Sequence, residues 1–543
     1  MTARPVLIAL CAVLAAGLVA CSNDESSSDT TTTSSALLVP GPGPGANPAA
    51  IPGVPTDDGR VNAAIDRVDG LAQEAMDRTG IPGMAVAVVH NGEVVFSRGY
   101  GVRDTGKPDR VDTDTAFQLA SVSKPIGASV IAKEIGDGTV TWDTPLVAHL
   151  PSFALADPYV TANVTIADMY AHRSGLPDHA ADQLEDIGYD RQQVLDRLRY
   201  LPLDPFRAQG QYTNFGLTAA AESVAAAAGT DWATLSEESL YRPLGMAHTS
   251  SRFADFEAEP NHAVGHVLVD GKYEAKYVRE PDAQAPAGGV SASVTDVATW
   301  LAMVMRGGTT ADGTRVVDED ALAASLAPAM RAGAGPTQTD ARDSFFGYGW
   351  EIGDDSSGRV RLTHSGAFYQ GAGTTIMAIP NLDLGIVVLT NASGNGTAEA
   401  LRNDFADLAI FGAVQADWAA GYEKLLTATV SAPVGELVGE QPPANPAPAA
   451  SNSAYMGTYA NDYVGPATVS ENGGQLILTI GPKHMQFPLT HWDGSVFTMI
   501  PSGENAPDGS IAKVTFEMNG DTASAVELEH FDEDGMGTLG RQP

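Results

Sequence analysis

The chain has 543 residues, and its 31 Lys and Arg stand against 67 Asp and Glu, which gives a formal net charge of −36. Nucleic acids and anionic bilayer surfaces attract clustered positive charge, so this acidic balance excludes both as electrostatic partners. Two cysteines cannot form a disulfide framework, and 43% hydrophobic residues are enough to build folded cores. The length allows about three domains.

Residues 1–21 are predicted to form a lipoprotein signal peptide. An apolar run follows the single charge of Arg4. This run is shorter than the roughly 20 residues needed to span a bilayer, so an uncleaved transmembrane anchor is the weaker interpretation. The run ends at Cys21 in a sequence that resembles the lipobox of bacterial lipoproteins. By that resemblance Cys21 would carry a lipid, and the chain would be exported and anchored on the outer face of the cytoplasmic membrane. The alternative for Cys21 is an incidental thiol.

The rest of the chain divides into two folded regions and two low-complexity stretches. Residues 22–55 are rich in Ser, Thr, Pro and Gly and cannot bury enough apolar surface to fold, so we expect a disordered tether. A Pro- and Ala-rich stretch over 426–452 is expected to be a linker. The predicted folded regions are therefore a large one over 56–425 and a small one over 453–543.

The large region is predicted to be an α/β domain whose two ends share one antiparallel sheet. A helical stretch at 60–79 precedes a hairpin over 84–98 that is centred on an Asn-Gly turn. From about 120 to 300 the pattern is mainly helical, and three strand patterns return within 359–390. This order predicts a sheet flanked by helices and a separate helical subdomain, with a ligand cleft between the two.

The small region shows a different pattern. Short alternating runs, such as 475–480 and 512–517, are separated by Gly, Asn and Asp turn residues. Alternation with a period of two is typical of strands that bury one face. The pattern therefore predicts an all-β barrel or sandwich for 453–543.

The strongest candidate for chemistry is Ser121, followed three residues later by Lys124. On a helix this spacing places both side chains on one face. A desolvated lysine amine can lose its proton and then accept the proton of a serine hydroxyl. Pro125 is tolerated in the first turn of a helix, so Ser121 is expected near a helix N-terminus, where free amides favour negative charge. Ser510 and Lys513 have the same spacing but lie in a strand pattern, where positions three apart point to opposite faces.

Two further motifs supply candidate substrate contacts. In the first, the hydroxyl of Tyr212 could relay a proton beside a lysine, and the amide of Asn214 could both donate to and accept from a substrate. The alternative for Tyr212 is a side chain partly buried in a turn. In the second, His364 offers a donor or a positive charge, and Gly366 lets a substrate approach a strand edge closely. A similar triplet at His90 is explained by the hairpin turn.

With these motifs in this order, the chain resembles the serine β-lactamase and penicillin-binding-protein superfamily. Within it, the chain looks closest to the branch related to class C β-lactamases, DD-peptidases and similar esterases. The resemblance covers about 60–415, and residues 453–541 resemble more weakly the lipocalin-like barrel often appended to such hydrolases. Further matching stretches in the family's usual order are 117–120, 139–146, 172–178, 243–246, 286–291 and 348–350.

The resemblance implies a role for each motif residue. Ser121 would be the acylated nucleophile, Lys124 its general base, and Tyr212 the relay of the proton to and from the leaving group. Asn214 would hold the substrate, and water would release the acyl group. The other implied substrate-binding residues are His364, Gly366 and Ala367, with the backbone amides of Ser121 and Ala367 as the oxyanion hole.

The implied function is a serine acyl hydrolase acting on an ester, peptide or β-lactam bond, with no cofactor and no metal. In this family the third motif often begins with Lys, whereas here it begins with His364. A lysine gives a permanent charge for a carboxylate and a histidine a titrating one, which favours esterase or peptidase activity over β-lactam hydrolysis. The alternative function is a lipid-anchored protein on the same scaffold that binds cell-wall peptide or a β-lactam without turnover.

Other chemistries have no motif in the sequence. His262 and His266 are four residues apart, but Gly265 disfavours the helix that would bring them together as metal ligands. His172 and His179 lie around a turn and are expected to be structural. Neither the His-Glu-x-x-His of zinc peptidases nor the Gly-x-Ser-x-Gly of α/β-hydrolases occurs.

Overall fold

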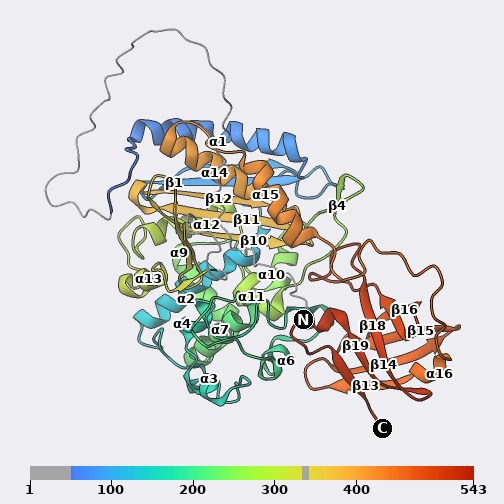
Figure 1. Cartoon of the computed structure of the whole chain (residues 1–543). Coiled ribbons are helices and arrows are strands. Elements are labelled where there is room, and N and C mark those ends of the chain that lie inside the picture. The colour runs from blue at the N-terminus through green and yellow to red at the C-terminus, as the bar shows by residue number, and fades with distance from the viewer. Residues whose placement is uncertain (1–49, 333–341) are drawn as a thin grey trace, which may run out of the picture.

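The computed structural model describes residues 50–332 and 342–543. The predicted signal peptide with Cys21, and the predicted tether as far as residue 49, lie outside the described residues. The described part forms a large α/β region built on one sheet, with a closed β-barrel beside it (Figure 1). The predicted fold class is confirmed.

One antiparallel sheet forms the centre of the α/β region, in the order β2-β1-β12-β11-β10-β9-β8-β7. Strands from the two ends of the region meet inside it, as predicted, because β1 pairs with both β2 and β12. The central strands β1 and β12 are buried along their whole length, consistent with their nearly continuous apolar sequences. The strands are β1 (Gly83–His90), β2 (Glu93–Gly101), β7 (Met330–Arg331), β8 (Ser344–Phe346), β9 (Glu351–Asp354), β10 (Val360–Phe368), β11 (Ala372–Ile379) and β12 (Leu384–Thr390).

Helices cover both faces of this sheet (Figure 1). On one face α1 (Asp58–Thr79) packs against α14 (Thr397–Phe411), and on the other α12 (Val294–Met305) packs against β1 and β12. The side chain of Asp57 caps the start of α1, and Gly80 ends the helix with φ 67°. The apolar residues of α1 recur every three or four positions and form the face that it buries: Val61, Ala64, Val68, Leu71, Ala72 and Ala75.

The residues between β2 and β7 form the mainly helical part, which lies beneath the sheet in Figure 1. Its central helix α2 (Ser123–Gly136) is buried on almost every side, which explains its small and apolar sequence. The other helices of the α/β region are α3 (Pro158–Asn163), α4 (Ile166–Tyr170), α5 (Asp182–Asp186), α6 (Arg191–Leu195), α7 (Asn214–Ala228), α8 (Trp232–Ser236), α9 (Arg242–Leu244), α10 (Phe253–Ala258), α11 (Ala285–Gly288), α13 (Glu319–Ser325) and α15 (Trp418–Leu426). Two small two-stranded sheets complete it: β3 (Phe117–Gln118) with β6 (Ser291–Ala292), and β4 (Val267–Val269) with β5 (Lys272–Glu274).

The barrel closes because its first strand pairs with both the second and the last. Buried and exposed residues alternate along strands such as β14, and aromatic rings of Tyr455, Phe497 and Phe516 pack inside. A short helix, α16 (Asn452–Tyr455), precedes the first strand. The strands are β13 (Gly457–Asn461), β14 (Gly465–Asn472), β15 (Gln475–Ile480), β16 (Met485–Asp493), β17 (Val496–Met499), β18 (Ala512–Asn519), β19 (Thr522–Leu528) and β20 (Thr538–Arg541).

The barrel packs directly on the α/β region. Buried apolar residues of both parts belong to one contiguous cluster. Tyr189 Oη donates to the carbonyl oxygen of Val464 at 2.9 Å. The two parts come close at Gly503, where φ is 140° and a Cβ atom would lie 2.2 Å from the carboxyl carbon of Asp186. A side chain at Gly503 would therefore displace the Asp186 carboxylate.

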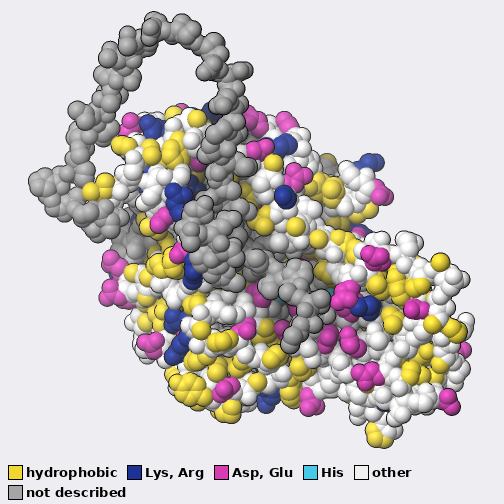
Figure 2. Space-filling model, in the orientation of Figure 1, with side chains coloured by type: hydrophobic (Ala, Val, Ile, Leu, Met, Phe, Trp, Pro, Cys, Tyr) yellow, Lys and Arg dark blue, Asp and Glu magenta, His cyan; other side chains and the backbone are white. Residues whose placement is uncertain are grey.

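Acidic side chains are spread over the visible surface of both parts, with fewer Lys and Arg among them (Figure 2). This distribution is that of a solvated surface with a high net charge. Within 50–332 and 342–543, no helix combines the length and the apolar composition that crossing a bilayer requires.

Candidate active site

Ser121 lies in a short 3-10 turn, η2 (Ala120–Val122), that leads directly into α2. Pro125 is the third residue of α2, so Ser121 precedes the first turn of the helix. Ala120 has φ 46°, in the left-handed region that costs a residue with a side chain roughly 1–2 kcal/mol. Complete burial of Ala120 against Phe368 holds this strained conformation immediately before the serine.

Lys124 is fully buried, and its amine lies among three acceptors. Nζ is 3.0 Å from Ser121 Oγ, 2.8 Å from Asn214 Oδ1 and 2.9 Å from the carbonyl oxygen of Ala287. In the neutral form the amine can donate to the amide and carbonyl oxygens while its lone pair faces the serine hydroxyl. This arrangement suits an amine that accepts the serine proton.

Tyr212 contacts the same serine oxygen from another side. Its Oη donates to Ser121 Oγ at 2.7 Å, and Lys124 Nζ lies 4.5 Å from the centre of its ring. The His172 ring packs against the Tyr212 ring at 4.6 Å, and the backbone amide of Tyr212 donates to Asp178 Oδ1 at 2.8 Å. Ser121 Oγ is therefore within hydrogen-bond distance of both side chains that could move its proton.

Asn214 begins α7, and Asp182 fixes its orientation. Asn214 Nδ2 donates to Asp182 Oδ2 at 2.7 Å, which leaves the amide oxygen facing Lys124. The same carboxylate oxygen lies 2.9 Å from His179 Nδ1. Desolvation opposes a charge on His179, but the hydrogen bond and ion pair with Asp182 prevail and raise its pKa to about 9. The sequence did not single out Asp182, and His179 was expected to be structural; only their three-residue spacing could have suggested the pair.

Strand β10 passes so close to Ser121 that Gly366 has no room for a side chain. A Cβ atom there would lie 2.3 Å from the carbonyl oxygen of Leu119 and 2.8 Å from the amide nitrogen of Ser121. Strand β9 pairs only with residues 360–363 of β10, so the later residues of β10 are free of that neighbour. Ala367 lines the same cavity as Ser121, so the backbone amides of these two residues remain the candidates for an oxyanion hole.

His364 does not line this cavity. It is 1% exposed within the sheet, and its pKa is held well below 6.5, first by burial and then by the positive charges of Lys124 and Arg402. The histidine is therefore uncharged at neutral pH. The expected substrate contact and titrating charge at His364 are not met in the structure, because burial in β10 removes both.

A cavity of about 250 Å³ opens at Ser121. Tyr212, Asn214 and Ala367 line it, so the structure brings these predicted residues together. Two other segments that the sequence did not connect with the site also line the cavity. The predicted linker contributes Thr429, Val430, Ala432 and Val434, and the barrel contributes Glu504, Asn505, Pro507 and Glu533.

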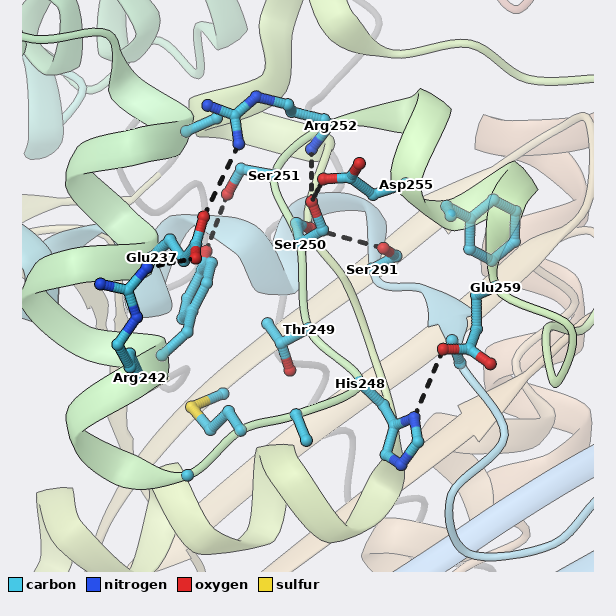
Figure 3. Close-up of a pocket in the computed structure, with 17 residues that line it drawn as sticks. Glu237, Arg242, His248, Thr249, Ser250, Ser251, Arg252, Asp255, Glu259 and Ser291 are labelled. Carbon is cyan, nitrogen blue, oxygen red and sulfur yellow. Dashed lines mark hydrogen bonds and ion pairs between the residues drawn. The ribbon is translucent and has the colours of Figure 1, made fainter.

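A second pocket, of about 460 Å³, lies around residues 245–255 (Figure 3). Its polar side chains are paired with one another: Ser250 with Asp255 at 2.7 Å, and His248 with Glu259 at 3.5 Å. Ser121 is not among its lining residues. In the part of the chain that the structure describes, no three His, Cys, Asp or Glu residues are grouped to hold a metal ion.

The chain is similar in sequence to known families and known proteins. A family model described as Beta-lactamase matches residues 68–411, and a domain of unknown function, DUF3471, matches residues 441–538. The chain is 27% identical over 428 residues to the unguisins hydrolase ungD of Aspergillus violaceofuscus, across 72% of this chain and 74% of that protein. It is 26% identical over 375 residues to esterase EstB of Burkholderia gladioli, across 62% of this chain and 92% of that protein.

A solved structure, the octameric penicillin-binding protein homologue from Pyrococcus abyssi, has a similar fold. Its TM-score is 0.54 at 18% identity, over 88% of this chain and 99% of that chain. At this identity the likeness concerns the fold alone.

Proposed function

The chain belongs to the beta-lactamase family, and from that premise we propose that it is a serine acyl hydrolase with a Ser–Lys–Tyr acyl-enzyme mechanism. The observation that carries the proposal is the position of Ser121 Oγ, 3.0 Å from Lys124 Nζ and 2.7 Å from Tyr212 Oη. Relatives named as a hydrolase and an esterase support hydrolysis as the class of reaction.

In the first step the neutral amine of Lys124 accepts the proton of the Ser121 hydroxyl, and Oγ attacks the carbonyl carbon of the substrate. Negative charge develops on the carbonyl oxygen, to which the amides of Ser121 and Ala367 donate. Each such donor is worth about 3–4 kcal/mol of barrier. As the intermediate collapses, Tyr212 Oη donates its own proton to the leaving group and takes back the proton held by Lys124. Water attacks the acyl-enzyme, gives up a proton through the same groups, and the serine hydroxyl is restored.

We propose esters or amides without a carboxylate near the scissile bond as the substrate class. A substrate carboxylate would need an unpaired cation, and the buried, uncharged His364 does not provide one. The cations that line the cavity, Arg279 and His179, are already paired with Glu185 and Asp182. Short p-nitrophenyl esters should therefore be hydrolysed, whereas a chromogenic cephalosporin should turn over slowly. High cephalosporinase activity without esterase activity would contradict this order of substrates.

Ser121→Ala tests the mechanism. A fluorophosphonate probe should label the wild type and not this variant, and ester hydrolysis should fall on the order of 10⁴-fold or more, because the nucleophile is lost. Ser470→Ala, an exposed serine of the barrel, is the matched control and should keep both activities. Equal labelling of Ser121→Ala and the wild type would refute the acyl-enzyme. Stable labelling by a fluorescent penicillin, with no release and no ester hydrolysis, would instead identify a binding protein.

A further inference from the structure

The loop that joins β17 to β18, residues 500–511, leaves the barrel and enters the cleft beside Ser121. We call this segment the barrel loop. Glu504, Asn505 and Pro507 of the barrel loop line the cavity at the serine, and the Glu504 side chain is 13% exposed. An acidic side chain is rarely so deeply buried unless it is paired, so its partners indicate what the loop does.

On the sheet side, Glu504 holds the turn that follows β10. Its carboxylate accepts from the backbone amides of Tyr369 at 2.5 Å and Gln370 at 3.2 Å. These two residues directly follow Phe368, the last residue of β10. The amide of Asp508 also donates to Tyr369 Oη at 2.9 Å. Strand β11 pairs with β10 to its end, whereas β9 pairs only with its first four residues, and the barrel loop adds a second support at the turn next to Ala367.

On the helical side, the same loop holds α5. The backbone amides of Glu504 and Asn505 donate to the Asp186 carboxylate at 2.8 and 3.0 Å. Asn505 Nδ2 donates to the backbone carbonyl of Asp182 at 3.1 Å. Asp182 in turn orients Asn214 beside the lysine. One loop therefore connects the two walls of the cleft.

Arg279 strengthens this connection between the two walls. Its guanidinium, 5% exposed, donates to Glu185 of α5 at 2.7 Å and lies 3.8 Å from Glu504. The same group is 4.6 Å from the centre of the Phe368 ring at the end of β10. Arg279 thus contacts α5, the barrel loop and the end of β10 at once, and so ties the two walls of the cleft together.

We propose that the barrel loop positions the end of β10 that carries the Ala367 amide and closes the cavity, and thereby limits the size of the acyl group that reaches Ser121. This inference rests on the serine hydrolase function proposed above. Glu504 and Asn505 are positioning residues, since they act through β10 and α5. The family model for the hydrolase region ends at residue 411, so the barrel loop adds to the site from outside it.

Two kinds of variant test the proposal. In the first, residues 503–508 are replaced by two glycines, and kcat/KM is measured for p-nitrophenyl acetate, butyrate, octanoate and laurate. The laurate-to-acetate ratio should rise on the order of 10-fold or more, because the cavity loses one wall, and kcat for acetate should fall. In the second, Glu504→Gln and Asn505→Ala should each lower kcat for acetate on the order of 10-fold while KM changes little, because the amide moves and the binding surface stays.

Glu471→Gln and Asn472→Ala are the matched controls, because they make the same changes at the exposed β14–β15 hairpin of the same barrel. Both should retain wild-type kinetics. Thermal unfolding shows which variants fold. If the shortened-loop variant does not fold, the single substitutions decide the question. Failure of the wild type to be labelled at Ser121 would refute the proposed function. A labelled wild type whose folded loop variants keep its kcat and its acyl-length profile would refute the role of the barrel loop alone.

Discussion

Ser121 Oγ lies within hydrogen-bond distance of two side chains, and each of these is held by groups that take no part in the chemistry. Asn214 and the carbonyl of Ala287 accept from Lys124, while the His172 ring packs on Tyr212. Activity at the site is therefore sensitive to changes that leave every reacting atom present. The tightest of these constraints is the contact between β10 and the serine.

Gly366→Ala should lower kcat/KM for a short ester on the order of 100-fold, because its Cβ atom would push β10 away from the Ser121 amide. Gly353→Ala is the control: it lies on the neighbouring strand β9, and nothing lies within 4 Å of its Cβ position. Steady-state ester hydrolysis, with thermal unfolding of both variants, makes the measurement. Equal activities of the two folded variants would show that the close contact at Gly366 is not needed.

The sequence predicted those site residues whose relation is local or belongs to a recognisable motif. Ser121 and Lys124 are one helical turn apart, so their shared face follows from spacing alone. Asn214 and Asp182 are 32 residues apart, and Glu504 and Tyr369 are 135 apart. No periodicity links such pairs, because tertiary packing alone brings them together. The burial that keeps His364 uncharged also results from the folding of the whole sheet, so the local sequence around His364 could not predict it.

Among the elements, β10 has unequal support along its length. Strand β9 pairs with its first four residues, and the barrel loop holds the turn at its other end. The predicted hairpin, helices and sheet could be recognised because each pattern is contained in its own segment. The predicted cleft had two walls, the sheet and the helices. The third wall could not be predicted, since the docking of a barrel across a Pro-rich linker leaves no periodic signal.

The contact between the barrel loop and the α/β region should weaken as the pH rises. Burial raises the pKa of Glu504 from 4.5 to about 8, although Arg279 and the amides of Tyr369 and Gln370 lower it. The charge of Asp186 on α5 raises the pKa of Glu504 further, and burial raises the pKa of Asp186 and of its neighbour Glu185 as well. A raised folded pKa means that the stabilisation is fully present below pH 4.5 and is lost as the pH passes through about 8.

We therefore expect the free energy of unfolding to fall by an amount on the order of a few kcal/mol between pH 5 and 9. Thermal unfolding across this range measures the effect. Glu504→Gln should flatten the dependence, because glutamine does not ionise, while Glu471→Gln should reproduce the wild-type curve. If the Glu504→Gln protein keeps the full pH dependence of the wild type, groups other than Glu504 cause the loss of stability.

For the whole molecule, the net charge of −36 acts on every substrate that approaches. Five carboxylates line the cavity itself, together with Arg279 and His179. We expect p-nitrophenyl esters that end in an amine to react faster than those that end in a carboxylate, on the order of 10-fold in kcat/KM at low salt. Raising the ionic strength to about 1 M should shrink this ratio, because the Debye length falls to about 3 Å. If the ratio does not change with salt, the long-range electrostatic field of the protein is not its cause.

The position of the barrel loop in the chain also determines when, during translation, the site can be completed. During synthesis Ser121, Lys124 and Tyr212 leave the ribosome long before Glu504, and earlier parts of a chain generally fold first. The reacting groups are therefore present for much of translation without the wall that completes their cavity. A product that stops before the barrel loop would carry every motif of the family and still lack this wall of the site. On this proposal the full rate and the selectivity for acyl length are reached only after the barrel loop has been made and docked.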